Sequence, residues 1–453
     1  MSVRVRFAPS PTGQVHIGNM RAAIFNWLYA RHHGGQFLLR IEDTDRERST
    51  PEAIQSVLDA MVWLGMDFDE DPMYQSARAD AHLAAAEALL ASGHAYRDNV
   101  GGKGECVVLR MPQGPVRFQD ELKGELVKDG ADMKDLVIVR SDGSPVFHLA
   151  NVVDDIEMGI THVIRGDDHI ENTYRHIALY EALGAEVPRF AHLPMIVNAQ
   201  GKPYSKRDGA AFVGEFRDEY LGDALFNFLA LLGWSPGDDR EVMTREDMIA
   251  AFDLSKVKSS AAQMDMRKFD WLNGQHIRLL PYDEYRARFV EALAAGDVDV
   301  AQADDALIDQ VAGLMHERTT RFSELPELCA HFFSETYAYD EKTVKKRLLK
   351  EGAMDHLAAV GNVFAEVSIW DGETMDAAIE GVAEVRETKS GQLFPLVRLA
   401  VSGLGRGPDF HAMLEILGQE RVVSRIEATL ERFRGEAWVI PESVWLRLWV
   451  VRT

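Results

Sequence analysis

Hydrophobic residues near the start of the chain alternate with polar ones and then change to helical spacing. Val3, Val5 and Phe7 fall on one face and predict a short strand. Two prolines and a glycine end this strand, and residues 20–31 then favour a helix. In such a strand–loop–helix unit the first N–H groups of the helix are unpaired and partly positive, so the loop favours an anion such as phosphate. We expect His16 to lie beside that anion.

Two further segments continue this pattern. Residues 36–41 read as a buried strand, and the carboxylates of Glu42, Asp43 and Asp45 follow it directly. Residues 51–64 have the apolar spacing of a helix, and another helix is expected between residues 75 and 98, ending at Ser92-Gly93. Because ligands of open α/β sheets bind at the carboxyl ends of the strands, we expect these carboxylates near a ligand. Solvated caps are the alternative interpretation for Asp43 and Asp45.

The second half of the sheet follows a segment of different character. Residues 105–146 contain short strand candidates separated by glycine and proline, which predicts a small β-rich insertion. Val163-Ile164 then reads as a short strand that ends in Arg165, a helix is expected over 170–183, and from about residue 221 helical spacing dominates. The predicted division of the chain is 1–75, 76–146, 147–200, 201–280 and a nearly all-α region at 281–453.

Composition narrows the class of protein. The 453 residues, 46% of them hydrophobic, predict a globular protein of several domains, without a bilayer-crossing run or a signal peptide, so we expect a cytoplasmic protein. Cys106 and Cys329 give neither a disulfide framework nor a metal pair, so no zinc site is expected. The net charge of −23 argues only weakly against nucleic acid, because the basic segment 340–350 is either a solvated helix face or an RNA-facing surface.

A glycine-flanked loop at residues 201–209 contains Ser205, Lys206 and Arg207. A mobile lysine in such a loop can neutralise the charge that develops on a polyphosphate, and it can arrive after the nucleotide has bound. A solvated basic loop is the alternative interpretation. Pro203 stiffens the loop and removes a backbone donor, which predicts a more preformed loop with Lys206 as its main cation.

These motifs resemble a known family. Residues 7–19, with His16-Ile17-Gly18-Asn19, resemble the HIGH signature of the class I aminoacyl-tRNA synthetases, specifically the glutamyl and glutaminyl branch. The loop at 201–209 resembles the KMSKS loop of that family, although Pro203 stands where its first lysine is usual. Segments at 220–235, 269–273 and 391–403 resemble bacterial glutamyl-tRNA synthetases, so the resemblance spans nearly the whole chain apart from a shortened insertion.

The resemblance implies an α/β fold: a Rossmann-like catalytic domain split by a small β-rich, acceptor-end insertion and followed by an all-α anticodon-binding region. It implies that L-glutamate is activated with ATP and Mg²⁺ and then transferred to the 3′ end of tRNA-Glu. The resemblance also implies a monomer. No zinc is expected, because the shortened insertion has one cysteine where many relatives carry a zinc cluster.

The family's functional positions can be assigned to residues of this chain. The catalytic assignments are His16, Asn19 and Lys206. The residues expected to bind ATP are Pro9, Thr12, Gly13, His16, Gly18, Asn19, Asp168, Ile196, Ser205, Lys206 and Arg207. The residues expected to bind glutamate are Arg6, Ala8, Ser10, Glu42, Phe147, Asn151 and Arg165. The residues expected to bind tRNA are Arg318, Lys345, Lys346 and Arg347.

Arg6 is the expected reader of the side-chain carboxylate, because a bidentate guanidinium fits that group and leaves donors unpaired against glutamine. Arg165 is the expected second cation, and Glu42 the expected partner of the ammonium. Phe147 stands where Tyr is common in the family, so one hydroxyl contact is missing.

Several alternatives stay open at the level of sequence. A non-discriminating or tRNA-Gln-charging paralogue shares these motifs, and a non-catalytic tRNA-binding paralogue is suggested by Pro203 and the shortened insertion. A glutaminyl-tRNA synthetase is disfavoured because its anticodon region is a β-barrel. A relative that glutamylates a queuosine-type base is disfavoured because it lacks the helical C-terminal region.

Overall fold

The computed structural model describes residues 2–45, 48–99, 102, 104–301 and 303–434. The chain forms two compact units that divide between His276 and Ile277. Among the described helices, none is both long enough and apolar enough to cross a membrane.

Two sheets of mostly parallel strands form the centre of the first unit. Strands β1 (Arg4–Phe7), β2 (Gln36–Ile41) and β3 (Met73–Tyr74) form one sheet in the order β1-β2-β3. The other sheet has the order β7-β6-β10-β9, and its strands are β9 (His162–Gly166), β10 (Arg189–Leu193), β6 (Pro115–Asp120) and β7 (Gly124–Asp129).

The two sheets meet where β1 lies beside the start of β9. The Thr161 amide donates to the Arg4 carbonyl at 2.9 Å, and the Arg4 amide donates to the Thr161 hydroxyl at 2.9 Å. This is where the chain changes from the first half of the sheet to the second, the position at which open α/β sheets bind ligands.

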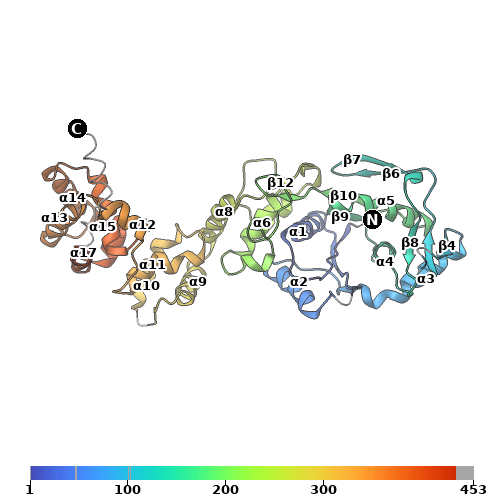
Figure 1. Cartoon of the computed structure of the whole chain (residues 1–453), viewed down its shortest axis with the longest axis horizontal. Helices are drawn as coiled ribbons and strands as arrows, with labels where there is room; N and C mark the ends of the chain where they lie inside the picture. Colours follow the sequence, from blue (N-terminus) through green and yellow to red (C-terminus); the bar gives the residue numbers. More distant parts are fainter. Residues whose placement is uncertain (1, 46–47, 100–101, 103, 302, 435–453) are drawn as a thin grey trace, which may run out of the picture. The chain divides into compact units, whose positions relative to one another are not determined.

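Helix α1 (Ile17–His32) packs on β1, β2 and β9 (Figure 1). The other helices of the first unit are α2 (Pro51–Trp63), α3 (Ala79–Ala91), α4 (Phe147–Glu157), α5 (Ile170–Ala182), α6 (Gly222–Leu231), α7 (Arg245–Ala251) and α8 (Met266–Leu279), the last of which continues past the division between the units.

The β-rich segment between α3 and α4 shares its core with the rest of the first unit. Strands β4 (Ala95–Asp98), β5 (Cys106–Leu109) and β8 (Leu136–Val139) form an antiparallel sheet, and the β6–β7 hairpin extends the central sheet through β10. One buried cluster joins Val116 and Phe118 of the hairpin to Leu38, Leu149 and Phe190. Burying each such side chain contributes about 1.5–3 kcal/mol, which fixes the hairpin against the strands that lead to the ligand-binding edge.

The sequence-based prediction of a helix between residues 75 and 98 was partly wrong. Helix α3 starts at Ala79 after a 3₁₀ turn, and Ala95–Asp98 forms strand β4. Pairing with β5, which puts Tyr96 opposite Val108, decides the conformation of these residues over any local preference.

Helices form the second unit, and no strand occurs among its described residues. They are α9 (Tyr282–Ala295), α10 (Asp305–His316), α11 (Leu325–Phe333), α12 (Glu341–Thr343), α13 (Ala353–Glu366), α14 (Gly372–Val385), α15 (Ser390–Ser402), α16 (Phe410–Leu417) and α17 (Gln419–Phe433) (Figure 1). The basic segment at 340–350 forms α12 and then one π-helical turn, Val344–Leu348.

Candidate active site

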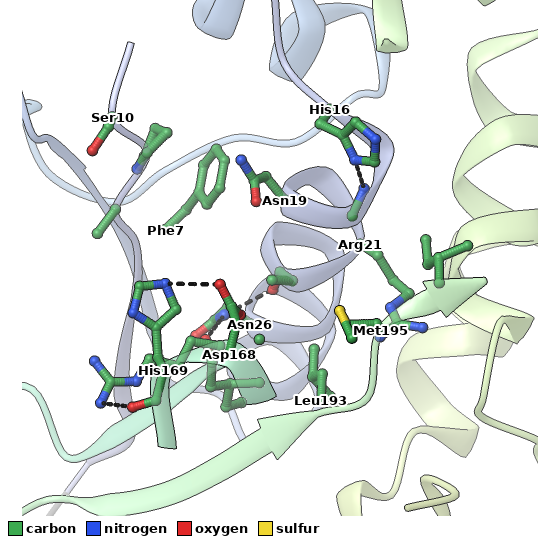
Figure 2. A pocket seen from close by; sticks show the side chains of 18 of the residues that line it. Phe7, Ser10, His16, Asn19, Arg21, Asn26, Asp168, His169, Leu193 and Met195 are labelled. Carbon is green, nitrogen blue, oxygen red and sulfur yellow. Dashed lines mark hydrogen bonds and ion pairs between the residues drawn. The ribbon is translucent and has the colours of Figure 1, made fainter. Parts of the chain in front are cut away.

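A cavity of about 470 Å³ opens where the two sheets meet. Its walls come from the end of β1 and the following loop, the start of α1, the start of α4, the end of β9, and the segment after β10. Figure 2 shows His16 and Asn19 at the start of α1, with Asp168 and His169 on another wall. The predicted residues that line this cavity are Arg6, Ala8, Pro9, Ser10, Thr12, His16, Gly18, Asn19, Glu42, Phe147, Asn151, Arg165, Asp168 and Ile196.

The start of α1 has the geometry of an anion-binding helix terminus. His16 is the N-cap residue, and its ring Nδ1 accepts a hydrogen bond from the Gly18 amide at 3.1 Å. Burial lowers the pKa of His16 below its usual value, although the backbone of Tyr204 and the charge of Glu215 oppose this shift. His16 is therefore neutral at neutral pH, and Asn19 is exposed beside it as an uncharged donor.

The basic loop lies close to the start of α1, but four predicted residues do not line the cavity: Gly13, Ser205, Lys206 and Arg207. The Lys206 ammonium lies 4.4 Å from the ring centroid of Phe212, whose ring packs edge-on against His16 at 5.9 Å. Residues 211–213 pair with the loop before α1, because Ile17 donates to the Ala211 carbonyl and Val213 to the Val15 carbonyl, each at 2.9 Å.

The loop is shaped by its own hydrogen bonds. Asp208 accepts from the amide and the hydroxyl of Ser205, both at 3.0 Å, and from the Asn198 side chain at 2.7 Å. The hydrogen bond from Asn198 lowers the pKa of Asp208; desolvation opposes this shift, and the hydrogen bonds from Ser205 reinforce it. Pro203 forms an antiparallel bridge with Val197 and lines the cavity.

Arg6 is held by a carboxylate that sequence analysis did not assign. Its Nε and one terminal nitrogen donate to the two oxygens of Asp155 at 3.0 and 3.3 Å. Arg40, which is fully buried, also contacts Asp155 and donates to Glu42 at 3.1 Å. Burial would raise the pKa of Asp155, but the charges of Arg40 and Arg6 outweigh it and lower this pKa to about 2.

Glu42 lies on the same polar network and faces the cavity. It is 7% exposed, and one of its oxygens accepts from the Asn151 amide at 2.9 Å as well as from Arg40. A carboxylate held in this way has acceptor capacity left for an ammonium group in the cavity. The structure therefore brings Arg6, Glu42 and Asn151 together around one end of the cavity.

Arg165 has no carboxylate among its hydrogen-bond partners in the described residues. It donates to the Thr173 hydroxyl at 2.7 Å and lies 3.4 Å from each of the His192 and His176 rings and from the His169 carbonyl. Burial, and then the positive charge of Arg6, lower the pKa of Arg165 to about 10. The cavity thus contains a buried cation whose charge is compensated by no directly bonded anion, and a bound carboxylate can supply that compensation.

Five residues of this network were missed by sequence analysis: Arg40, Asp155, Thr173, His176 and His192. Two of them carried a readable signal. Arg40 lies on β2 two positions before Glu42, which follows the end of that strand, and Asp155 lies one helical turn after Asn151 on α4. His192 reaches Arg165 because the two residues lie opposite each other in the β9–β10 pairing, and Thr173 reaches it from α5. No local pattern predicts these contacts.

The predicted tRNA-binding residues lie in the second unit, so they do not belong to the cavity. Arg318 is exposed after α10, and Lys345, Lys346 and Arg347 are exposed on the π-helical turn. Lys345 lies 3.5 Å from Glu341, an exposed pair that contributes little to stability. Across the described part of the chain, no cluster of three His, Cys, Asp or Glu side chains is arranged to hold a metal ion.

A sheet crevice with a histidine-capped helix start, next to a lysine loop, defines the catalytic domain of a class I tRNA synthetase. The family described as tRNA synthetases class I (E and Q), catalytic domain, matches residues 2–103 and 99–271. The family described as anticodon binding domain matches residues 280–430. Curated relatives of this chain identify the glutamyl branch of the class, and the chain belongs to the glutamate–tRNA ligase family.

Two curated relatives illustrate this similarity. Glutamate–tRNA ligase 2 of Halorhodospira halophila is 40% identical over 95% of this chain and 98% of its own length. The glutamate–tRNA ligase of Xanthomonas euvesicatoria is 41% identical over 95% of this chain and 99% of its own length.

A solved structure shows the same fold. The crystal structure of a glutamate tRNA ligase from Elizabethkingia meningosepticum, in complex with its amino acid, superposes with a TM-score of 0.81 at 30% identity, covering 95% of this chain and 99% of that one. The α/β fold class and the helical anticodon-binding region predicted from the sequence are thereby confirmed.

Proposed function

We propose that this chain is a glutamate–tRNA ligase that uses ATP to form glutamyl-adenylate and then charges tRNA-Glu. The observation that carries the proposal is the charge pattern of the cavity, which places the cations of Arg6 and Arg165 beside the carboxylate of Glu42. Glutamate has two carboxylates and one ammonium, so its charges are complementary to this set. The names of the relatives support the same activity.

In the activation step an oxygen of the α-carboxylate attacks the α-phosphorus of ATP, and pyrophosphate leaves with the bonding electron pair. The protein contributes positioning and charge stabilisation. The start of α1 and the neutral His16 would hold the phosphates, and Lys206 would leave its place over Phe212 to stabilise the leaving pyrophosphate. Mg²⁺ would bind with ATP, and we propose no zinc site. The terminal ribose hydroxyl of the tRNA would then displace AMP from the adenylate.

A second and larger cavity, of about 810 Å³, suits the entry of the tRNA 3′ end. It shares Ser10, Thr12, Glu42 and Phe147 with the first cavity, so the adenylate carbonyl would be accessible from it. Arg48 and Arg140 on its walls supply cations for the terminal phosphates.

We extend the proposal to the division of labour along the chain. Residues 1–75 and 147–200 would form the two catalytic halves, 76–146 would meet the acceptor end, 201–280 would carry the lysine loop and contact the stem, and 281–453 would bind the anticodon. Within the last region we propose Arg318 and the exposed side chains of Lys345, Lys346 and Arg347 as tRNA contacts. We also propose that the protein is a cytoplasmic monomer. Light scattering during size-exclusion chromatography measures its molar mass and so tests the oligomeric state.

The test incubates the purified full chain with Mg-ATP, radiolabelled glutamate and total bacterial tRNA. Acid-precipitable glutamyl-tRNA is expected, and its formation should require ATP. Absence of this product with tRNA that a known glutamate–tRNA ligase can charge would refute the proposed function.

A further inference from the structure

Asp120, on the β6–β7 hairpin, is connected to the substrate cavity through one histidine. The Asp120 carboxylate lies 2.6 Å from Nδ1 of His192, and Nε2 of His192 lies 3.4 Å from Nε of Arg165. The three side chains are 1%, 0% and 8% exposed, so water does not compete for these contacts. These contacts connect β6, which lies outside the two proposed catalytic halves, to Arg165, the cation of the cavity that has no directly bonded carboxylate among the described residues.

The geometry at Asp120 sets which nitrogen of His192 carries a proton. Besides His192, one oxygen of Asp120 accepts from the amides of Leu122 and Lys123, each at 2.9 Å. Burial would raise the pKa of Asp120, but the hydrogen bonds from His192 and from the two amides outweigh it and lower this pKa. An ionised carboxylate only accepts hydrogen bonds, so Nδ1 of His192 must carry the proton.

The other nitrogen of His192 is consequently an acceptor. Burial lowers the pKa of His192, an effect that its hydrogen bond to Asp120 opposes and the charge of Arg165 reinforces, so the ring is neutral at neutral pH. Its Nε2 then accepts from Nε–H of Arg165, and the Thr173 hydroxyl lies 2.9 Å away on the same side. Arg165 is thus oriented by a neutral acceptor that leaves its charge free for an anion.

We propose that Asp120 is a positioning residue for amino-acid recognition: it fixes the Nδ1-protonated form of His192, which orients Arg165 toward the carboxylate of the substrate without neutralising it. The inference rests on the proposed function, in which Arg165 binds glutamate. Direct pairing of Arg165 with a protein carboxylate would orient it equally well, but it would compensate the charge that the substrate has to compensate. The neutral imidazole of His192 orients Arg165 without compensating its positive charge.

The variant Asp120→Asn tests this role with little change in shape. Its side-chain oxygen can still accept from Leu122 and Lys123, but its NH₂ group replaces the oxygen that faces Nδ1 of His192. The amide donates to Nδ1, the proton of the ring moves to Nε2, and an N–H then faces the N–H of Arg165. Asp135→Asn is the matched control, because Asp135 is an exposed aspartate in the same β-rich segment whose oxygens accept from Tyr96 and Met111.

Steady-state aminoacylation of saturating tRNA measures KM for glutamate, KM for ATP and kcat. For Asp120→Asn we expect KM for glutamate to rise at least about tenfold, equivalent to about 1.4 kcal/mol, while KM for ATP stays within about twofold. Asp135→Asn should leave all three constants unchanged. An unchanged KM for glutamate, or equal losses in both KM values together with a lowered Tm, would overturn the inference.

Nitrogen NMR of protein labelled with ¹⁵N-histidine gives a second readout that does not depend on activity. The wild-type His192 signal, assigned by its loss in His192→Gln, should show a protonated Nδ1, and in Asp120→Asn the proton should be on Nε2. A wild-type ring protonated at Nε2 would overturn the inference even if the variant failed to fold. If the wild-type protein formed no glutamyl-tRNA, the proposed function would fail, and NMR would still decide whether Asp120 sets the protonation of His192.

Discussion

Replacing Asp155 with asparagine removes the carboxylate on which Arg6 and Arg40 converge. The two arginines are 4% and 0% exposed and Asp155 is 2% exposed, so solvent cannot take over the lost charge. The pKa of Asp155 is lowered from 3.8 to about 2, which corresponds to a preference of about 2 kcal/mol for the ionised form in the folded state. Breaking a buried ion pair by removing one partner costs about 3–5 kcal/mol. We expect Asp155→Asn to lower the free energy of unfolding of the first unit by about 3 kcal/mol.

Calorimetry at pH 7.5 measures this loss, and Tm should fall by roughly 6–12 °C. The same variant should raise KM for glutamate, because Arg6 loses the group that orients it. Asp59→Asn on the exposed face of α2 is the control, since Gln55 is the one hydrogen-bond donor to Asp59 among the described residues. This variant should change the stability by less than about 0.5 kcal/mol.

The pH dependence gives an independent check with a defined sign. Because the pKa of Asp155 is lower in the folded than in the unfolded state, its contribution is fully present above about pH 4 and is lost as the pH falls toward about 2. Wild-type protein should therefore lose more stability across this window than Asp155→Asn. A variant within about 1 kcal/mol of wild type at pH 7.5, or with the same acid dependence, would refute this account of the buried arginines.

Three further predictions concern other parts of the molecule. Lys206→Ala should leave tRNA affinity nearly intact and lower kcat at least about tenfold, or roughly 1.4 kcal/mol of barrier; an unchanged kcat would exclude the role given to this lysine. His148 has its pKa lowered to about 4, by burial first and then by Arg175 and Arg165. The unfolded chain thus takes up a proton below about pH 6.5 while the folded chain does not. Stability should fall between pH 6.5 and pH 4, and the fall should be smaller in His148→Gln in thermal scans. Replacing both Lys345 and Lys346 with alanine should weaken tRNA binding and reduce the slope of log affinity against log salt by up to about 2; an unchanged slope would remove both from the interface.

The sequence predicted those elements whose pattern is local. Strand β2 has the predicted bounds, and α2 begins behind Thr50, whose hydroxyl accepts from the Ala53 amide at 3.2 Å as an N-cap. The loop before α1 and the helix itself were predicted because proline and glycine leave few conformations available, although α1 begins at Ile17 and not at the predicted residue 20. Gly13 in this loop has φ +144°, which disfavours any other residue. The cavity-lining residues that belong to these elements could therefore be predicted from the sequence.

Contacts between distant parts of the chain could not be predicted in this way. The Asp155 carboxylate pairs with arginines more than 100 positions away, and Asp120 reaches Arg165 only because β6 pairs with β10. Strand β4 was missed because its conformation depends on pairing with β5. The resting place of Lys206 over Phe212 likewise depends on how residues 211–213 pair with the loop before α1.

The central claim is that two buried cations, Arg6 and Arg165, select glutamate over glutamine by its second carboxylate. The most direct test compares kcat/KM for glutamate with that for glutamine on separate tRNA-Glu and tRNA-Gln transcripts. Because glutamine offers one carboxylate to the two buried cations Arg6 and Arg165, we predict a preference for glutamate of at least about 10³-fold on each transcript that is charged. Comparable values for the two amino acids, or charging with glutamine alone, would contradict the account.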